Sequence, residues 1–238
     1  MEFNEELFKT SQKFRLDHPD IVNKGISIDN YLLSVFSLTP RDNSQMDILK
    51  LLNAFRRNFL TASFLFESQQ GNVGVQATRT MIESGEILCA YLVSPQEVGR
   101  LIRNSNGKSI SDKLFKIIGE WITKLNYKRI TKLISDIKNT KTTLNNTLSH
   151  ANAAYNLVYS GIKKDEDGVF TDGFFDSNEE QIISNYLFLL TIYHDFSILI
   201  FELISKVELE PYLTDSLNEV PDFHLEDLFG KYVPTWYK

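Results

Sequence analysis

A polar cluster in the second half of the chain contains the residue best suited to acid–base chemistry. The segment NNTLSHAN, at residues 145–152, places His150 among small polar side chains. On a helix, Asn146 and His150 would lie one turn apart on the same face. An unperturbed histidine titrates near neutral pH, so His150 could act as a general acid or base. The alternative is a surface histidine that is hydrogen-bonded to an asparagine.

A second group of charged residues, Arg79, Glu83 and Glu86, is spaced four and then three positions apart. On a helix these residues share a face, and Arg79 could pair with Glu83. Glu86 lies among apolar residues, so its carboxylate should reach the edge of the core and need a cationic partner. Arg79, Arg56 or Arg57 could supply that cation. Both a structural ion network and a functional anion-binding pocket are compatible with this pattern.

A third candidate is the dipeptide His194-Asp195. It is similar to the His-Asp pair of HD-type metal phosphohydrolases, which are all-α enzymes. In that interpretation His150 would be the first ligand and Asp215 or Asp222 the last, since histidine and carboxylate suit a divalent metal. The alternative is a core histidine, because helical spacing places His194 on the same side as several apolar residues.

Helical periodicity dominates the elements that must position these residues. Apolar positions recur every three or four residues over most of the chain, which favours α-helices. We expect helices at residues 5–15, 28–38, 44–70, 73–93, 95–103, 110–125, 128–159, 182–205 and 225–229. Between the expected helices at residues 128–159 and 182–205, residues 161–178 contain glycines and an acidic run. This composition predicts an irregular insertion with a small hairpin at residues 169–175.

The stretch at residues 182–205, IISNYLFLLTIYHDFSILIFELIS, is apolar on every side. A helix of this kind is normally buried on all sides, so we expect it at the centre of the domain. It is also long enough to cross a membrane. His194, Asp195 and Glu202 argue against that alternative, because charged residues inside a bilayer are costly.

These patterns predict an all-α fold: a single helical-bundle domain with a buried central apolar helix and a short irregular or hairpin insertion. We expect short helices packed on the bundle at residues 1–43, a helical core domain at residues 44–205, and a wrapping tail at residues 206–238.

Composition limits the function classes. The chain has 238 residues, a hydrophobic content of 42% and a formal net charge of −6, which argues against a large basic surface for duplex DNA. The lone Cys89 excludes an intrachain disulfide, and its helical neighbours predict a packed thiol rather than a nucleophile. The first residues, MEFNEELFKT, lack the basic and apolar regions of a secretion signal. We therefore expect a cytoplasmic protein without a membrane anchor.

The segments ATRTMIESGEILCAYL and TLSHANAAY, followed by an irregular loop and a final apolar helix, resemble a group of uncharacterised bacterial helical proteins. Those proteins are distantly similar to HEPN-type domains, the higher-eukaryote and prokaryote nucleotide-binding family. The similarity covers residues 44–205. It implies a helical protein that binds RNA or a nucleotide, and possible endoribonuclease activity, in bacterial defence or stress response.

The resemblance also implies roles for individual residues. HEPN ribonucleases cleave RNA without a metal or cofactor, with an arginine a few positions before a histidine on one helix. No arginine has that spacing before His150, so Arg79, oriented by Glu83, would have to replace it from another helix. His150 would be the acid or base, and Asn146 and Ser149 would position a phosphate or ribose.

Two further expectations accompany this interpretation, and two alternatives to it stay open. Arg56 and Arg57 would add positive charge for substrate binding, and two copies would pair through exposed helix faces. The first alternative function is a non-catalytic protein-interaction module, which a large exposed apolar face would favour. The second is the HD-type metal phosphohydrolase described above.

Overall fold

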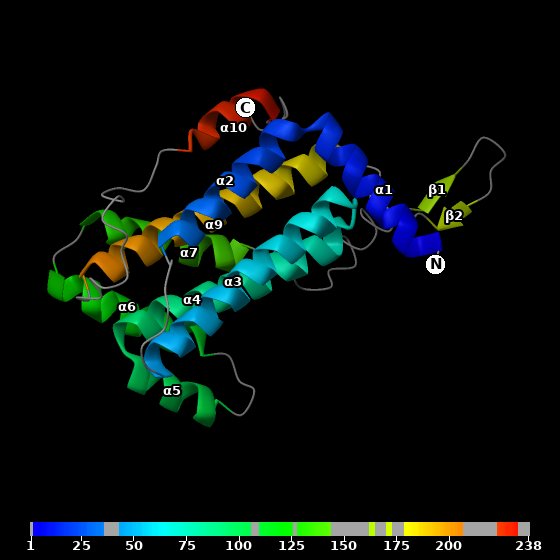
Figure 1. The fold of residues 1–238 in the computed structure, drawn as a ribbon. Helices are drawn as coiled ribbons and strands as arrows, with labels where there is room; N and C mark the ends of the chain where they lie inside the picture. The colour runs from blue at the N-terminus through cyan, green and yellow to red at the C-terminus, as the bar shows by residue number, and fades with distance from the viewer. Residues whose placement is uncertain are drawn as a thin grey trace.

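The fold was analysed in a computed structural model that describes residues 2–35, 43–105, 110–125, 128–143, 162–164, 170–172, 179–206 and 223–232. Within these ranges the helices are α1 (Glu2–Asp17), α2 (Pro19–Val35), α3 (Asn43–Glu67), α4 (Gly71–Val93), α5 (Pro95–Asn104), α6 (Ser111–Leu125), α7 (Lys128–Thr143), α9 (Glu179–Lys206) and α10 (Leu225–Tyr232). They form a helical bundle, so the predicted all-α class is confirmed (Figure 1).

Helix α9 is the centre of this bundle, as its sequence predicts. It contacts α2, α3, α4, α7 and α10, and most of its large side chains are buried, among them Tyr186, Leu190, Tyr193 and Phe196. One stripe, which includes Phe188, Asp195 and Glu202, is only partly buried. By length and composition α9 could also span a membrane, but this is weak evidence because the core helix of a soluble protein has the same properties. In the described part of the chain it lies against other helices on several sides (Figure 1).

Two glycines let neighbouring helices approach α9 closely. A Cβ atom on Gly25 of α2 would lie 3.1 Å from the Leu190 side chain. A Cβ atom on Gly85 of α4 would lie 2.8 Å from the ring of Phe196. Side chains at these positions would separate the helices, so the two glycines fix how deeply α9 is packed.

Helices α3 and α4 make the most extensive helix–helix contact in the described chain. The predicted helix ends near Gly71, whereas α3 ends at Glu67 and Gly71 already begins α4. The turn has Gln69 in a left-handed conformation, with φ of 58°. The Gln69 N–H donates to Phe66 O and the Gln70 N–H donates to Leu65 O, which satisfies the last carbonyls of α3.

The N-terminal region differs from the prediction in helix length. Helix α2 begins at Pro19, although the sequence indicated a helix only from residue 28. A proline at the first helical position needs no N–H partner, so the helix can begin there.

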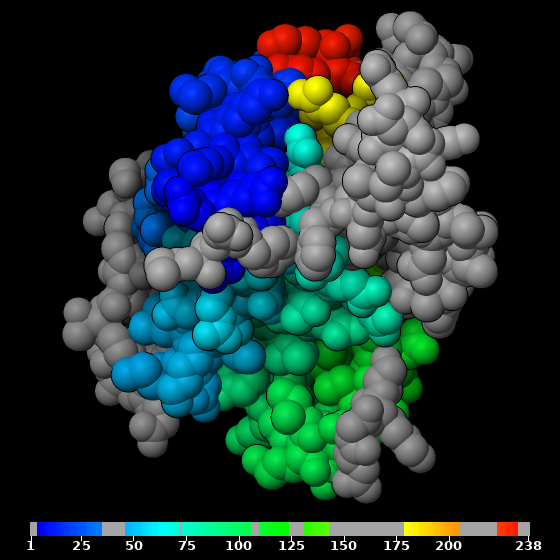
Figure 2. All heavy atoms as spheres, turned by 90° about the vertical axis from the view of Figure 1, so that its right-hand side faces the viewer, coloured from blue at the N-terminus to red at the C-terminus, as the bar shows by residue number. Residues whose placement is uncertain are grey.

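At the other end of the chain, α10 packs against α2 and α9 (Figure 2). Lys231 and Tyr232 of α10 donate hydrogen bonds of 2.6 and 2.8 Å to the Asp20 carboxylate.

The insertion contains a strand pair that differs from the predicted hairpin. Strand β1 (Ile162–Lys164) pairs antiparallel with β2 (Phe170–Asp172), and Lys163 lies opposite Thr171. The prediction confined both strands to residues 169–175, which is wrong. The two strands lie on either side of the acidic, glycine-containing sequence DEDG at residues 165–168, a composition that favours turns.

Candidate functional site

Arg79 and Glu83 lie on the exposed side of α4 and form the predicted pair. The Arg79 Nε donates to Glu83 Oε1 at 3.2 Å, and the two side chains are 39% and 46% exposed. Such a pair contributes about 0.3–0.5 kcal/mol to stability. No described residue forms a hydrogen bond with the two terminal nitrogens of the Arg79 guanidinium, so these donors are available to a ligand.

The pair forms one wall of a small polar cavity of about 140 Å³ between α4, α6 and α7. The cavity is lined by Arg79, Glu83, Ser111, Asp112, Phe115, Lys138, Lys141 and Thr142. At its mouth, Lys138 Nζ lies 3.9 Å from Asp112 Oδ1, and both side chains are exposed. This loose contact leaves the Lys138 ammonium free to move toward an anion in the cavity.

A buried ion pair forms the floor of the cavity. Lys141 Nζ donates to both carboxylate oxygens of Glu86 at 2.8 Å and to Ser111 Oγ at 2.9 Å. The side chains of Lys141 and Glu86 are only 8% and 1% exposed. The sequence correctly indicated that Glu86 needs a cation, but the expected arginine partners were wrong. The partner is Lys141 of α7, whose ammonium reaches both carboxylate oxygens.

The sequence did contain a feature that could have identified Lys141. Apolar residues of α7 recur with a near-heptad rhythm, and Ile137 is fully buried. Lys141 follows Ile137 by four positions, so it lies on the apolar face of the helix, where an apolar side chain is expected. A lysine on an inward-facing stripe must be paired with a carboxylate, and Glu86 is that carboxylate.

Burial governs the titration of the groups behind the cavity. It raises the pKa of the Glu86 carboxyl, while the Lys141 ammonium acts in the opposite direction. One turn further along α4, burial raises the pKa of the Cys89 thiol well above its ordinary value. Cys89 is fully buried, which confirms the predicted packed thiol. A thiol that stays protonated and inaccessible is a poor nucleophile.

The two arginines predicted to bind substrate do not line this cavity. Arg56 makes two hydrogen bonds with the Asp29 carboxylate, at 2.8 and 2.6 Å. The Tyr193 hydroxyl donates to the same carboxylate at 2.6 Å. This hydrogen-bond network joins α3 to α2 and α9, so the Arg56 guanidinium stabilises the packing of these three helices. Arg57 is exposed on α3, and its role in binding stays a prediction.

The other predicted site residues, Asn146, Ser149 and His150, lie outside the described residues. Helix α7 is described as far as Thr143, and the rest of the predicted helix at residues 128–159 is likewise outside. Thr142 lines the cavity together with Arg79 and precedes Asn146 by four positions. In the sequence, the polar cluster at residues 145–152 therefore begins three positions after a residue that lines the cavity.

His194 and Asp195 lie near the middle of α9. The imidazole of His194 packs edge-to-face on the ring of Phe223, with centroids 5.5 Å apart. Burial, and secondly the neighbouring Asp136, raises the pKa of Asp195 to about 7. Within the described ranges, no group of three or more His, Cys, Asp or Glu side chains could hold a metal ion. The other proposed metal ligands (His150, Asp215 and Asp222) lie outside those ranges.

Comparisons of the chain with protein-family models, with characterised proteins and with solved structures find no match. The α4–α6–α7 cavity brings together Arg79 and Glu83 from the sequence analysis with Lys138 and Lys141, which that analysis did not select.

Proposed function

We propose that the protein binds RNA or a nucleotide, with one phosphate group held in the α4–α6–α7 cavity. The observation that supports this most directly is that Arg79 lines the cavity and that no described residue forms a hydrogen bond with its two terminal guanidinium nitrogens. A planar guanidinium is well suited to bidentate contacts with phosphate oxygens. The volume of about 140 Å³ suits a phosphate group, with the rest of the ligand outside.

The charges around the cavity set the expected strength of binding. Arg79, Lys138 and Lys141 each lie beside a carboxylate, namely Glu83, Asp112 and Glu86. Because cations and carboxylates balance, a phosphate must replace Glu83 and Asp112 as the partner of the exposed cations. This arrangement favours moderate, salt-sensitive binding of a single strand or nucleotide over tight binding of duplex DNA.

The same proposal includes acid–base chemistry by His150. Thr142 faces the cavity, and Asn146 and His150 follow it by four and eight positions. In this mechanism Arg79 stabilises phosphate charge, Glu83 orients Arg79, and His150 transfers a proton during RNA cleavage. Asn146 and Ser149 position the phosphate or ribose. The proposed role in bacterial defence or stress response rests on the family resemblance alone.

One observation favours a second candidate function, a protein-interaction module that includes pairing of two copies. Leu60 and Phe64 lie one turn apart on α3 and are 49% and 36% exposed. Apolar side chains at this spacing suit contact with another helix. Sedimentation of the wild type and of a Leu60→Ser/Phe64→Ser variant tests the pairing: a dimer that the double substitution dissociates supports it, and a monomeric wild type refutes it.

The RNA proposal is tested with fluorescently labelled single-stranded RNA, by anisotropy for binding and by gel analysis for cleavage in the presence of a chelator. Arg79→Ala should weaken binding about tenfold, because charge-assisted hydrogen bonds are lost. His150→Ala should preserve binding and abolish cleavage. The matched control is Lys116→Ala, since Lys116 forms a similar exposed pair with Glu120 on α6.

Each result has a definite meaning. Absence of RNA and nucleotide binding by the wild type would refute the proposed function. Wild-type binding by Arg79→Ala would refute the cavity as the phosphate site. A folded His150→Ala protein that cleaves RNA at the wild-type rate would refute the acid–base role.

A further inference from the structure

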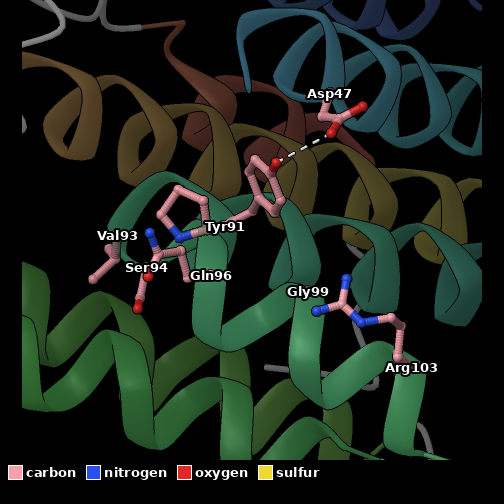
Figure 3. Close-up of a pocket in the computed structure, with 8 residues that line it drawn as sticks. Asp47, Tyr91, Val93, Ser94, Gln96, Gly99 and Arg103 are labelled. Carbon is pink, nitrogen blue, oxygen red and sulfur yellow. Dashed lines mark hydrogen bonds between the residues drawn. The ribbon is translucent and has the colours of Figure 1, made fainter. Parts of the chain in front are cut away.

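A second cavity, larger and more open, lies where α3, α4 and α5 meet, and nothing in the sequence analysis indicated it. Its volume is about 790 Å³, within the usual range for small-molecule sites. Asp47 of α3 and Tyr91 of α4 form one part of its lining, and Pro95, Gln96 and Arg103 of α5 form another (Figure 3). The buried Val98 holds α5 against the bundle and so fixes this lining.

The Asp47 part of the cavity carries a neutralised charge. The Lys50 ammonium donates to Asp47 Oδ1 at 3.0 Å, and the Tyr91 hydroxyl donates to Asp47 Oδ2 at 3.3 Å (Figure 3). The hydrogen bond from Lys50 is the main reason that the pKa of Asp47 lies below its usual value. Asp47 is therefore ionised at neutral pH, and its contact with Tyr91 orients the aromatic ring.

The α5 part carries donors without partners in the described chain. Arg103 forms no ion pair with a described residue, and its guanidinium is turned back toward Gly99 (Figure 3). A Cβ atom on Gly99 would lie 3.7 Å from the Arg103 Nη1, so the glycine leaves space beside the guanidinium. Ser94, at the start of α5, makes no side-chain capping hydrogen bond. In the α4–α6–α7 cavity, by contrast, every cation lies beside a carboxylate.

The charge and the apolar surface of the second cavity limit the class of ligand. Lys50 neutralises Asp47, so the remaining positive charge of the lining is that of Arg103, which pairs with no carboxylate among the described residues. A monoanion matches this charge, whereas a phosphate dianion would leave surplus negative charge near Asp47. Carboxylate geometry suits bidentate binding by a guanidinium. The ring of Tyr91 and the side chains of Val93 and Pro95 add apolar surface to the same lining.

We propose that the α3–α4–α5 cavity binds a small organic acid, with its carboxylate on Arg103 and its apolar or aromatic body against Tyr91, Val93 and Pro95. Ser94 and Gln96 provide further hydrogen bonds to the carboxylate or to polar substituents. The proposal is independent of RNA binding, because the two cavities have no lining residue in common.

Calorimetric titration of the full chain with acetate, hexanoate, phenylacetate and indole-3-acetate tests the site. We expect saturable binding of at least one acid with an apolar body and weaker binding of acetate. Phenylacetamide, which has the same shape as phenylacetate without the charge, should bind at least about tenfold more weakly, since the charged hydrogen bonds are lost. Phenyl phosphate should bind no tighter than phenylacetate.

Two variants and a matched control assign the binding to this cavity. Arg103→Ala should reduce affinity at least about tenfold. Arg100→Ala removes an exposed arginine from the same helix that does not line the cavity, and it should have little effect. Gly99→Leu keeps Arg103, favours the helix and fills the space beside the guanidinium, so it should also weaken binding.

Several outcomes would overturn the proposal. These are no binding of any acid in the series, equal affinity for phenylacetamide and phenylacetate, tighter binding of phenyl phosphate, or an equal loss in Arg100→Ala and Arg103→Ala. Loss of acid binding in Arg79→Ala with none in Arg103→Ala would assign the acids to the other cavity.

Discussion

The buried pair of Glu86 and Lys141 makes a sharp prediction about stability: Lys141→Met should strongly destabilise the fold. Methionine preserves much of the apolar stem of lysine but removes the ammonium group. The Glu86 carboxylate would then lose both of its 2.8 Å hydrogen bonds while remaining 1% exposed. Breaking a buried ion pair in this way costs about 3–5 kcal/mol. We expect a decrease of that size in the free energy of unfolding at mildly alkaline pH.

The loss should depend on pH in a defined direction. Burial already raises the folded-state pKa of Glu86, and Lys141 limits that rise. Without the ammonium the folded pKa increases further, so folded Glu86 holds a proton that the unfolded chain releases. This contribution to stability is complete below the unfolded pKa of about 4.3 and is lost as pH rises through the folded pKa. The deficit of Lys141→Met should therefore shrink on acidification.

Urea unfolding followed by far-ultraviolet circular dichroism measures both effects. Lys138→Met is a matched control on the same helix, because Lys138 is exposed and lies 3.9 Å from Asp112; its effect should stay within about 0.5 kcal/mol. Glu86→Gln combined with Lys141→Met should be more stable than Lys141→Met alone, since no buried charge remains. A single variant within about 1 kcal/mol of the wild type at all pH values, or a double variant without recovery, would contradict the reasoning.

Two further predictions concern α9 and its neighbours. Burial and the nearby Asp136 raise the pKa of Asp195 to about 7, so the free energy of unfolding of the wild type should fall as pH rises through that value. Asp195→Asn should make the free energy of unfolding less dependent on pH. Parallel pH profiles of unfolding for the two proteins would refute this. Gly85→Ala should lower stability by about 1–3 kcal/mol, because the new Cβ atom would lie 2.8 Å from the Phe196 ring. The control is Gly119→Ala on α6, where a Cβ atom would meet nothing within 4 Å. Alanine favours the helix more than glycine does, so this variant should have a higher melting temperature than the wild type. An equal change in stability in both variants would contradict the packing argument.

Much of the fold could be predicted from the sequence because helices depend on local patterns. Apolar spacing indicated each described helix, and the apolar surface of α9 on every side indicated its central position. Local rules also explain the errors. Pro19 can either end a helix or begin one, and the sequence pattern did not show that it begins α2. Likewise, the composition of the insertion predicts a hairpin but does not fix which residues form its two strands.

The candidate site could be predicted only in part. The Arg79–Glu83 pair follows from helical spacing, because its members are four residues apart. The buried carboxylate of Glu67 shows the opposite case. It accepts hydrogen bonds from Arg15 at 2.7 Å and Tyr186 at 3.1 Å, residues that are 52 and 119 positions away. A sequence identifies a carboxylate that needs a partner, but many cations and hydroxyls could satisfy it.

The sequence by itself determined that this protein is a helical bundle, the approximate positions of the described helices, and that α9 is the central helix. Only the tertiary structure decided that Lys141 neutralises Glu86, and that Asp47 and Tyr91, 44 positions apart, meet in a cavity with Arg103. Helix formation depends on neighbours three or four residues apart, so its pattern is visible along the chain. Ion pairs and cavities depend on which helix faces pack together, and that choice is made by the whole core at once.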